Sequence, residues 1–240
     1  MNDVKAELAP TGVLRAGINL SNFLLVSGKS ANGDPEGVAP DMAREIARRL
    51  GVPVTYVTFP SPGDLADAAE TNVWDIGLIG AEPQRAEKIA FTPAYVEIEA
   101  TYLVPAGSKL QSIAEVDRPG VRIAVFGRSA YGLWLERNIK QATLVRGDSI
   151  DASYKLFIDE KCDALAGLKP RLLKDVQALP GARILDGRFS AVQQAIGTAR
   201  KNAAGAAFLA KFVAEAKASG FVAKLIERHK VQGLSVAAAS

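Results

Sequence analysis

The stretch Ile76-Gly77-Leu78-Ile79-Gly80-Ala81-Glu82-Pro83-Gln84-Arg85 decides the fold of this chain. It opens with a short apolar run bounded by glycines, which is typical of a buried parallel strand. A second stretch repeats the pattern, with Val121–Phe126 as the strand and Gly127-Arg128-Ser129-Ala130 behind it. An arginine follows each strand, and a guanidinium group is a planar donor fork that matches a carboxylate. The two stretches therefore predict a binding cleft for a small anionic molecule.

The composition excludes several classes of protein. The 240 residues suffice for one large domain or two small ones, and 48% apolar with 23% charged residues is ordinary for a globular protein. The net charge is +3, and the positively charged residues are scattered rather than gathered in a basic run interleaved with aromatic residues. We therefore expect no nucleic-acid partner. A single cysteine, Cys162, excludes an internal disulfide and a cysteine-rich metal site, and we expect no cofactor.

The sequence carries no apolar stretch long enough to span a bilayer and no signal-peptide pattern at its start. The protein is therefore either cytosolic or secreted with its signal peptide removed.

Alternating strand and helix patterns occur in both halves of the chain. In the first half, a polar loop at 19–34 interrupts the alternation, and Gly51 stands where a helix should end. The strands are expected at 14–18, 52–59, 76–79, 121–126, 143–145, 164–167 and 182–185. The helices between them are expected at 43–50, 64–70, 130–140, 149–160 and 171–178, and two more helices close the chain.

Two extended segments without a helix pattern, 95–105 and 192–198, separate these halves. They predict two α/β lobes joined by two crossover strands, with residues 1–103 and 193–240 in one lobe and 104–192 in the other. The ligand is expected in the cleft between the lobes, because such hinges permit closure around a ligand.

The order of motifs resembles a known family. Trp74–Gly80 is followed by Arg85 and then by Ile89-Ala90-Phe91-Thr92-Pro93-Ala94-Tyr95, while Gly37–Gly51 and Lys217–His229 match further helices. Together these motifs resemble the type II periplasmic solute-binding proteins of ABC transporters, specifically the family that binds polar amino acids. The resemblance covers nearly the whole chain.

This resemblance implies roles for individual residues. Arg85 would bind the ligand carboxylate, the loop after the first strand would add polar and aromatic contacts, and 127–130 would lie at a helix N-terminus, which favours an anion. One glutamine of the return crossover is expected to face the hinge interior. The predicted ligand-binding residues are Asn19, Asn22, Phe23, Ser61, Gly80, Ala81, Glu82, Arg85, Gly127, Arg128, Ser129, Ala130, Tyr131, Leu168 and Gln194.

The chain departs from the family at two of these positions. Leu168 stands where the family places an aspartate that holds the α-ammonium group of the ligand, and Arg128 stands where a threonine is usual. Leucine cannot pair with an ammonium group. Three alternatives follow: the ligand is an organic acid, it carries two anionic groups, or Glu82 takes over the ammonium group.

Each candidate also has an ordinary structural role. Arg85 could simply pair with Glu82 or Glu87 on the surface. Ser129 could serve as a helix cap, and Tyr131 could serve in helix packing, without any contact to a ligand. His229 falls on an apolar helix stripe and is expected to pack there. Cys162 is expected to be a buried small apolar residue.

The chain shows no nucleophile with a base, no phosphate loop and no metal-ligand cluster, so we expect a binding protein rather than an enzyme. The resemblance implies a monomeric periplasmic protein that closes on a small carboxylate-bearing solute, an amino acid or an organic acid, and delivers it to an ABC permease. One alternative is a dehydratase of the same fold that acts on a prephenate- or arogenate-type acid through Glu82. Another is a ligand-sensing input domain.

Overall fold

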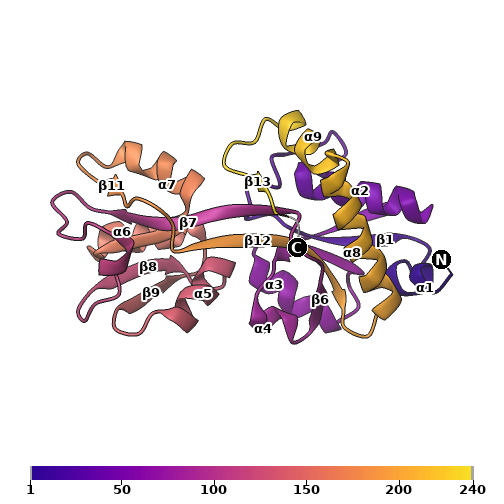
Figure 1. Cartoon of the computed structure of the whole chain (residues 1–240), viewed down its shortest axis with the longest axis horizontal. Coiled ribbons are helices and arrows are strands. Elements are labelled where there is room, and N and C mark those ends of the chain that lie inside the picture. Colours follow the sequence, from indigo (N-terminus) through magenta and orange to yellow (C-terminus); the bar gives the residue numbers. More distant parts are fainter. Residues whose placement is uncertain (1, 239–240) are drawn as a thin grey trace. The chain divides into compact units, whose positions relative to one another are not determined.

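The computed structural model describes residues 2–238, and its contacts divide the chain into two compact units. Unit 1 contains the residues up to Glu97 and from Gln193 onward, and unit 2 contains Ile98–Val192. The chain leaves unit 1 within β7 (Val96–Val104) and returns within β12 (Ser190–Ala199), as Figure 1 shows. These are the two segments for which extended structure was predicted.

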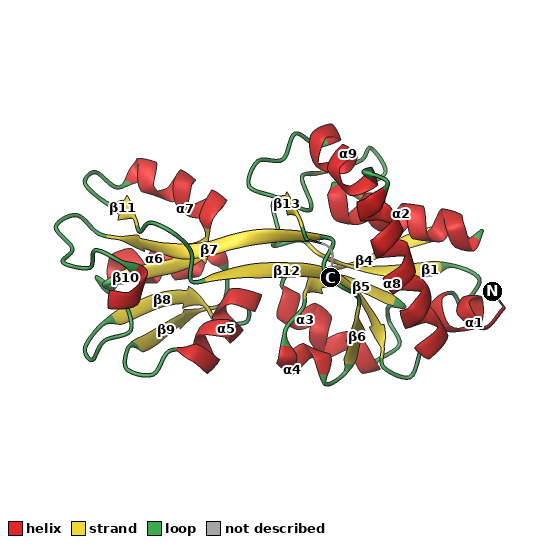
Figure 2. Cartoon of the chain, viewed as in Figure 1, coloured by secondary structure: helices red, strands yellow, loops and turns green. Residues whose placement is uncertain are grey.

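Unit 1 is built on a sheet in the order β4-β1-β5-β12. Strand β1 is parallel to both of its neighbours, whereas β12 is antiparallel to β5, with Gln194 opposite Gly80. The sheet is therefore mixed: β5 is buried and parallel to β1, as predicted, but it is antiparallel to β12 because the returning crossover strand pairs there. The elements of this unit (Figure 2) are α1 (Asn2–Leu8), β1 (Leu14–Asn19), β2 (Gly28–Lys29), β3 (Pro35–Glu36), α2 (Val38–Leu50), β4 (Val54–Phe59), α3 (Pro62–Asp67), β5 (Ile76–Gly80), α4 (Pro83–Ala86), β6 (Ile89–Phe91), α8 (Ala203–Ala218), α9 (Phe221–Arg228) and β13 (Ser235–Val236).

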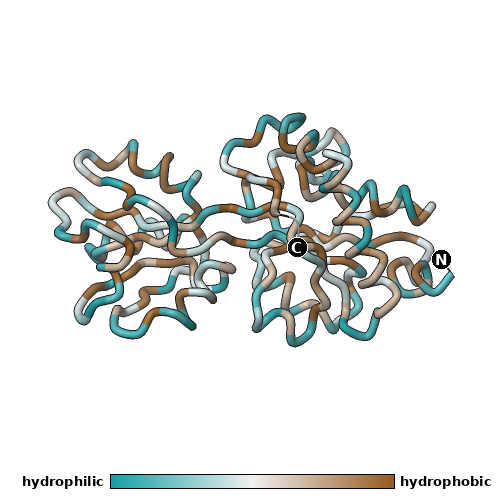
Figure 3. Tube along the Cα trace, in the orientation of Figure 1, coloured by the Kyte–Doolittle hydropathy of each residue, from teal (hydrophilic) through white to brown (hydrophobic). Residues whose placement is uncertain are grey.

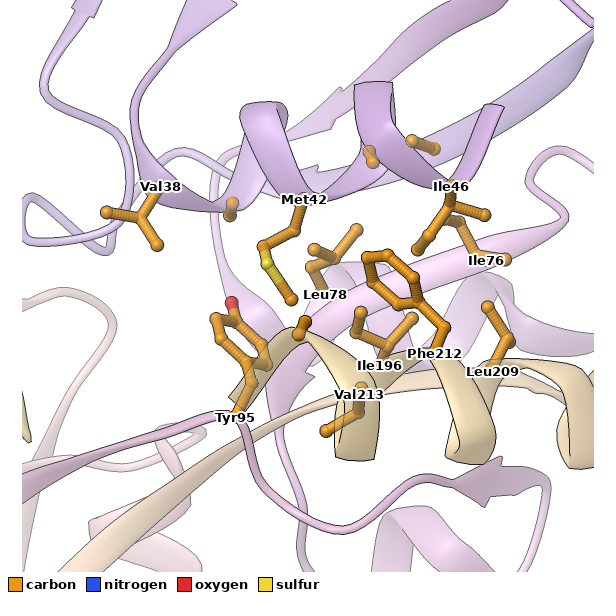
Figure 4. Close-up of a cluster of buried hydrophobic side chains, with 14 of the residues drawn as sticks. Val38, Met42, Ile46, Ile76, Leu78, Tyr95, Ile196, Leu209, Phe212 and Val213 are labelled. Atoms are coloured by element: carbon orange, nitrogen blue, oxygen red, sulfur yellow. The ribbon is translucent and has the colours of Figure 1, made fainter. Parts of the chain in front are cut away.

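The core of unit 1 lies between α2, α8 and one face of the sheet. Figure 4 shows Met42 and Ile46 of α2 pointing toward Phe212 of α8, with Leu78 of β5 between the helices. The next residue of β5, Ile79, belongs to a second cluster with Leu65 and Trp74. Successive residues of a strand face opposite sides, so β5 supplies both layers of apolar packing and is buried throughout.

Helix α2 begins immediately after Gly37, whose φ of 146° is in the region that favours glycine. A Cβ atom at this position would also collide with the carbonyl oxygen of Leu25. We expect Gly37→Ala to destabilise the protein by about 2 kcal/mol, because the backbone strain and the collision act together. Urea denaturation measures this loss.

A matched control for this variant is Gly28→Ala in the neighbouring β2–β3 hairpin, where the added Cβ would meet no atom closer than 3.9 Å. We expect its stability to stay within about 0.5 kcal/mol of the parent. An equal loss in both variants would contradict the assignment of strain to Gly37.

Unit 2 is a smaller sheet in the order β7-β10-β8-β9, in which β10, β8 and β9 are parallel. Strand β7 is antiparallel to β10, and β11 pairs with β7 rather than extending the parallel sheet. The core gathers Leu103, Phe157, Leu165 and Leu172. The elements are β8 (Arg122–Phe126), α5 (Ala130–Asn138), β9 (Thr143–Gly147), α6 (Ile150–Asp159), β10 (Ala164–Leu168), α7 (Lys169–Asp175) and β11 (Arg183–Ile184).

The carboxylate of Asp117 joins the segment before β8 to the loop before β9. It accepts hydrogen bonds from the backbone N–H groups of Lys140, Gln141 and Ala142 at 2.7 to 3.1 Å. Partial burial acts to raise the pKa of Asp117, but these three N–H groups outweigh it and hold the pKa below its ordinary value of 3.8.

We therefore expect Asp117→Ala to cost about 1–2 kcal/mol of stability at pH 7. The folded-state pKa lies below the unfolded one, so this contribution is present above about pH 4 and disappears as pH falls through the folded-state pKa. Urea denaturation of parent and variant at pH 7 and pH 3 checks whether the stability difference between them shrinks on acidification, as expected. A difference between parent and variant that grew on acidification would contradict it, and Asp186→Ala, at an exposed position, is the control.

Several elements were missed in the sequence. Helix α1, the single turn α4 and the short strands β6 and β13 carry too few residues to show a period. The two short strands form by pairing with longer ones, β6 with β12 and β13 with β7. His229 is largely buried as expected, and its Nε2 also lies 2.8 Å from Oδ2 of Asp41 in the first turn of α2. Figure 3 shows how hydrophilic residues concentrate in the turns and hydrophobic residues in the strands.

Candidate functional site

Arg85 lies at the exit of β5 in unit 1 and is only 5% exposed. Its Nη1 donates a hydrogen bond of 2.8 Å to the carbonyl oxygen of Gly80, the last residue of the strand. The turn that carries it begins with Pro83 after Glu82, so the chain folds back over the strand end. A simple surface ion pair does not account for this burial. The backbone therefore positions the guanidinium group at the exit of β5.

Gly80, Ala81 and Gln194 lie together with Arg85. Gln194 is opposite Gly80 in the antiparallel pairing of β12 with β5, and its side chain is buried. The N–H of Ala81 donates to the carbonyl oxygen of Gln193 at 2.7 Å, which continues the pairing past the end of β5. The returning strand therefore brings a glutamine from late in the chain to the exit of the motif that carries Arg85.

The loops after β1 and β4 reach the same edge of the sheet. Strands β4, β1 and β5 are parallel, so the residues that follow them, including Asn19 and Ser61, cluster with Gly80 at the carboxyl ends of the strands. The carbonyl oxygen of Phe59 accepts a hydrogen bond from the N–H of Leu20, which holds the two loops together. Unit 1 thus collects its predicted site residues at one edge.

The polar side chains of these loops also shape the backbone. Oδ1 of Asn19 accepts from the N–H and the hydroxyl of Ser21, and Oδ1 of Asn22 accepts from the N–H of Leu24 at 3.2 Å. Ser61 caps α3 by accepting from the N–H of Asp64 at 3.1 Å. Phe23, in contrast, is 39% exposed and is available for an apolar contact.

Unit 2 presents an equivalent edge after β8 and β10. These strands are parallel with Leu165 opposite Ala124, so Leu168 at the end of β10 and the loop after β8 lie at the same edge of the sheet. Ser129 caps α5, since its Oγ accepts from the N–H of Gly132 at 2.9 Å and donates to the carbonyl oxygen of Phe126. Arg128 is exposed and Ala130 is the first residue of the helix.

Tyr131 and Leu168 are buried within unit 2, at 4% and 6% exposure. Burial raises the pKa of the Tyr131 phenol, and a hydrogen bond with Ser129 opposes this effect, so the hydroxyl stays neutral at physiological pH. Leu168 places an apolar side chain at the position where the family resemblance implied an acidic one.

Lys169, which directly follows Leu168, is a candidate that sequence reasoning missed. Its Nζ donates to Glu99 of β7 at 3.0 Å, and Arg188 lies 3.6 Å from the same carboxylate. A lysine at the first position of a helix behind a buried strand was the available signal. The pairing with Glu99 depends on β7, which is distant in sequence.

No group of three histidine, cysteine or acidic side chains placed to hold a metal ion occurs within residues 2–238. In the same part of the chain, no helix combines the length and apolar character needed to cross a membrane.

Comparisons with known proteins define the family. The model of the bacterial extracellular solute-binding proteins, family 3, matches residues 17–232, and the chain belongs to this family. A search of curated protein sequences finds no match.

Solved structures share the fold at low sequence identity. A mutant of ArgBP from T. maritima has a TM-score of 0.76 at 21% identity, over 95% of this chain and 100% of that one. The cysteine-binding protein of Campylobacter jejuni has a TM-score of 0.74 at 18% identity, over 95% and 92% of the two chains. The ancestral amino acid-binding protein AncCDT-1, a precursor of cyclohexadienyl dehydratase, has a TM-score of 0.73 at 20% identity, over 92% and 97%. The predicted type II binding-protein fold is confirmed.

Proposed function

We propose that this protein is an extracytoplasmic solute-binding protein that captures a small carboxylate-bearing solute and delivers it to an ABC permease. Membership of family 3 supports the general role. The single observation that carries the ligand class is Arg85, a buried guanidinium group fixed to the carbonyl of Gly80 at the end of β5. Such a group binds a carboxylate through two parallel, charge-assisted hydrogen bonds.

The mechanism is closure of two lobes, for which unit 1 and unit 2 are the candidates. The carboxylate docks first on the edge of unit 1 that holds Arg85, Gln194 and the loop after β1. Unit 2 then adds donors from Arg128 and from the helix N-terminus at Ser129. Exclusion of water strengthens the charge-assisted hydrogen bonds, so the ligand and the closed state stabilise each other. The permease recognises the closed form.

The ligand is an organic acid without an α-ammonium group. Leu168 is buried at the end of β10 and offers no partner for a cation, while Arg128 adds positive charge in unit 2, where Lys169 and Arg188 share the single carboxylate of Glu99. A second carboxylate on the ligand would be favoured by this excess of positive charge. Simple α-amino acids are therefore expected to bind weakly.

Matched acid pairs that differ only in the amino group test this function. A thermal-shift screen with isothermal titration calorimetry compares L-glutamate with glutarate, L-aspartate with succinate, and L-leucine with 4-methylpentanoate. We expect the amino-free acids to raise the melting temperature and to bind at least tenfold more tightly. Tighter binding of the amino acids would overturn the ligand class, and no saturable binding of any member of a wider panel of acids would overturn the function.

The second candidate function is a dehydratase, since the fold is shared with AncCDT-1, an amino acid-binding precursor of cyclohexadienyl dehydratase. Glu82 is the candidate acid, since it precedes α4 at the same edge as Arg85. Incubation with prephenate separates the two functions. We expect no turnover in the parent, and consumption of prephenate that Glu82→Gln removes would assign the protein to the enzymes.

A further inference from the structure

Unit 2 contains a pocket at the opposite end of β10 from the candidate site. Its cavity volume is about 260 Å³. Pro105 follows β7, Cys162 precedes β10, and Ala182 precedes β11, so the pocket lies where these three strands begin or end together. Leu168 is at the other end of β10, about 13 Å away at 3.3 Å per residue. The pocket is therefore separate from the edge to which the proposed function assigns the solute.

The residues that line this pocket leave few polar groups in need of a hydrogen-bond partner. Two of the lining residues are prolines, which have no N–H group. The N–H groups of Cys162 and Ala182 already donate to the carbonyl oxygens of Phe157 and Leu179. Burial raises the pKa of the Cys162 thiol, which therefore stays uncharged. The apolar part of the wall is formed by Pro105, Phe157, Ile158, Leu179, Pro180 and Ala182.

One charged side chain, Lys161, belongs to the lining of the pocket. Within residues 2–238, no hydrogen bond or ion pair holds its ammonium group. Its backbone φ of 50° lies in the left-handed region, which most residues avoid, so the turn after α6 fixes where this lysine stands. Beside it Ile158, although apolar, is 42% exposed. An apolar cavity with one cation at its rim complements an apolar molecule that carries one negative charge.

We propose that this pocket is a second small-molecule site, which takes a compact aromatic or branched aliphatic monocarboxylate with its apolar body inside and its carboxylate on Lys161. The size is adequate, because a dry apolar cavity of about 150 Å³ already binds benzene. Solvent access at the rim allows the carboxylate to remain hydrated on one side. The site is distinct in place and chemistry from the edge that holds Arg85, and it does not depend on the proposed function.

The experiment uses benzoate as the probe, with benzyl alcohol as its uncharged counterpart, and measures binding to the whole protein by NMR chemical-shift titration. We expect saturable binding of benzoate with shifts at Ile158 and Ala182, and binding of benzyl alcohol about fivefold weaker, which corresponds to an exposed ion pair of about 1 kcal/mol. Ala182→Leu, which fills the cavity, should lower the affinity for benzoate at least tenfold. Lys161→Gln should lower the affinity for benzoate about fivefold and leave the affinity for benzyl alcohol unchanged.

Two controls make the outcome decisive. Lys174→Gln removes an exposed lysine of unit 2 outside the pocket and should change nothing. Binding that Arg85→Ala removes and Ala182→Leu leaves intact would place benzoate at the other edge and overturn the proposal. No saturable binding of benzoate would overturn it as well.

Discussion

Arg85→Ala should lower the affinity for the carboxylate solute by about a hundredfold or more, while the protein remains folded. Removal of one partner of a buried charge-assisted pair typically costs 2–5 kcal/mol of binding free energy, roughly thirtyfold to several thousandfold. Arg85 meets the conditions for that range, since it is 5% exposed and its Nη1 is held by Gly80. Isothermal titration calorimetry with the tightest-binding acid of the screen measures the loss.

Two further variants separate charge, geometry and folding. Arg85→Lys keeps the positive charge but loses the planar fork, so we expect an intermediate loss of about tenfold. Arg48→Ala removes an arginine of α2 whose side chain is 72% exposed and paired with Glu45, and it should bind like the parent. Unchanged affinity in Arg85→Ala, with a melting temperature close to that of the parent, would remove the central support for the proposed site.

Asp75→Ala should destabilise unit 1 by about 3 kcal/mol, the second large effect that the structure predicts. The carboxylate of Asp75 accepts hydrogen bonds from the backbone N–H, Nε and Nη2 of Arg15 at 2.6 to 3.0 Å, and its side chain is 3% exposed. Loss of the carboxylate leaves these donors without an acceptor at the junction of β1 and β5. The carbonyl oxygen of Asp75 also accepts from the hydroxyl of Thr198 on β12.

Urea denaturation measures this effect most clearly through Trp74, which lies next to Asp75 and is 4% exposed. The other tryptophan, Trp134, belongs to unit 2, so a Trp134→Phe background assigns the fluorescence signal to unit 1. Glu160→Gln is the matched control, because its ion pair with Arg122 is about 40% exposed on each side and should contribute little to the free energy of unfolding. Equal losses in the two variants would contradict a special role for Asp75.

The motif Trp74–Gly80 illustrates why a pattern can identify a family while serving mainly the fold. Trp74 packs against Gly17 and Gly77, and its Nε1 donates to the carbonyl oxygen of Leu65. Asp75 holds Arg15, and Gly77 has Leu65 where a Cβ atom would lie. These residues align β5 with β1, and in this way they place the turn that carries Arg85.

The candidate site was predictable where a local signal existed. Gly80, Ser129 and Arg85 follow apolar runs closely, and residues behind buried strands gather at the edge of an α/β sheet where ligands commonly bind. Lys169 was missed, although it also follows a strand, because its partner Glu99 comes from β7, a segment seventy positions earlier. The hydrogen bonds of Asn19 and Asn22 to the backbone could not be predicted either. Their amide oxygens hold loop turns, and turn geometry leaves no periodic pattern in the sequence.

The sequence alone determined the alternation of strands and helices, the two extended crossovers and the arginine behind β5, because periodicity, glycine punctuation and residue order are local properties. Only the tertiary structure decided that β12 returns antiparallel beside β5 and sets Gln194 opposite Gly80. It also decided that Arg85 is buried, and that Cys162, Lys161 and Ala182 surround one pocket. The physical reason is that pairing partners and burial depend on which distant segments meet, and that choice is made by the packing of the whole chain.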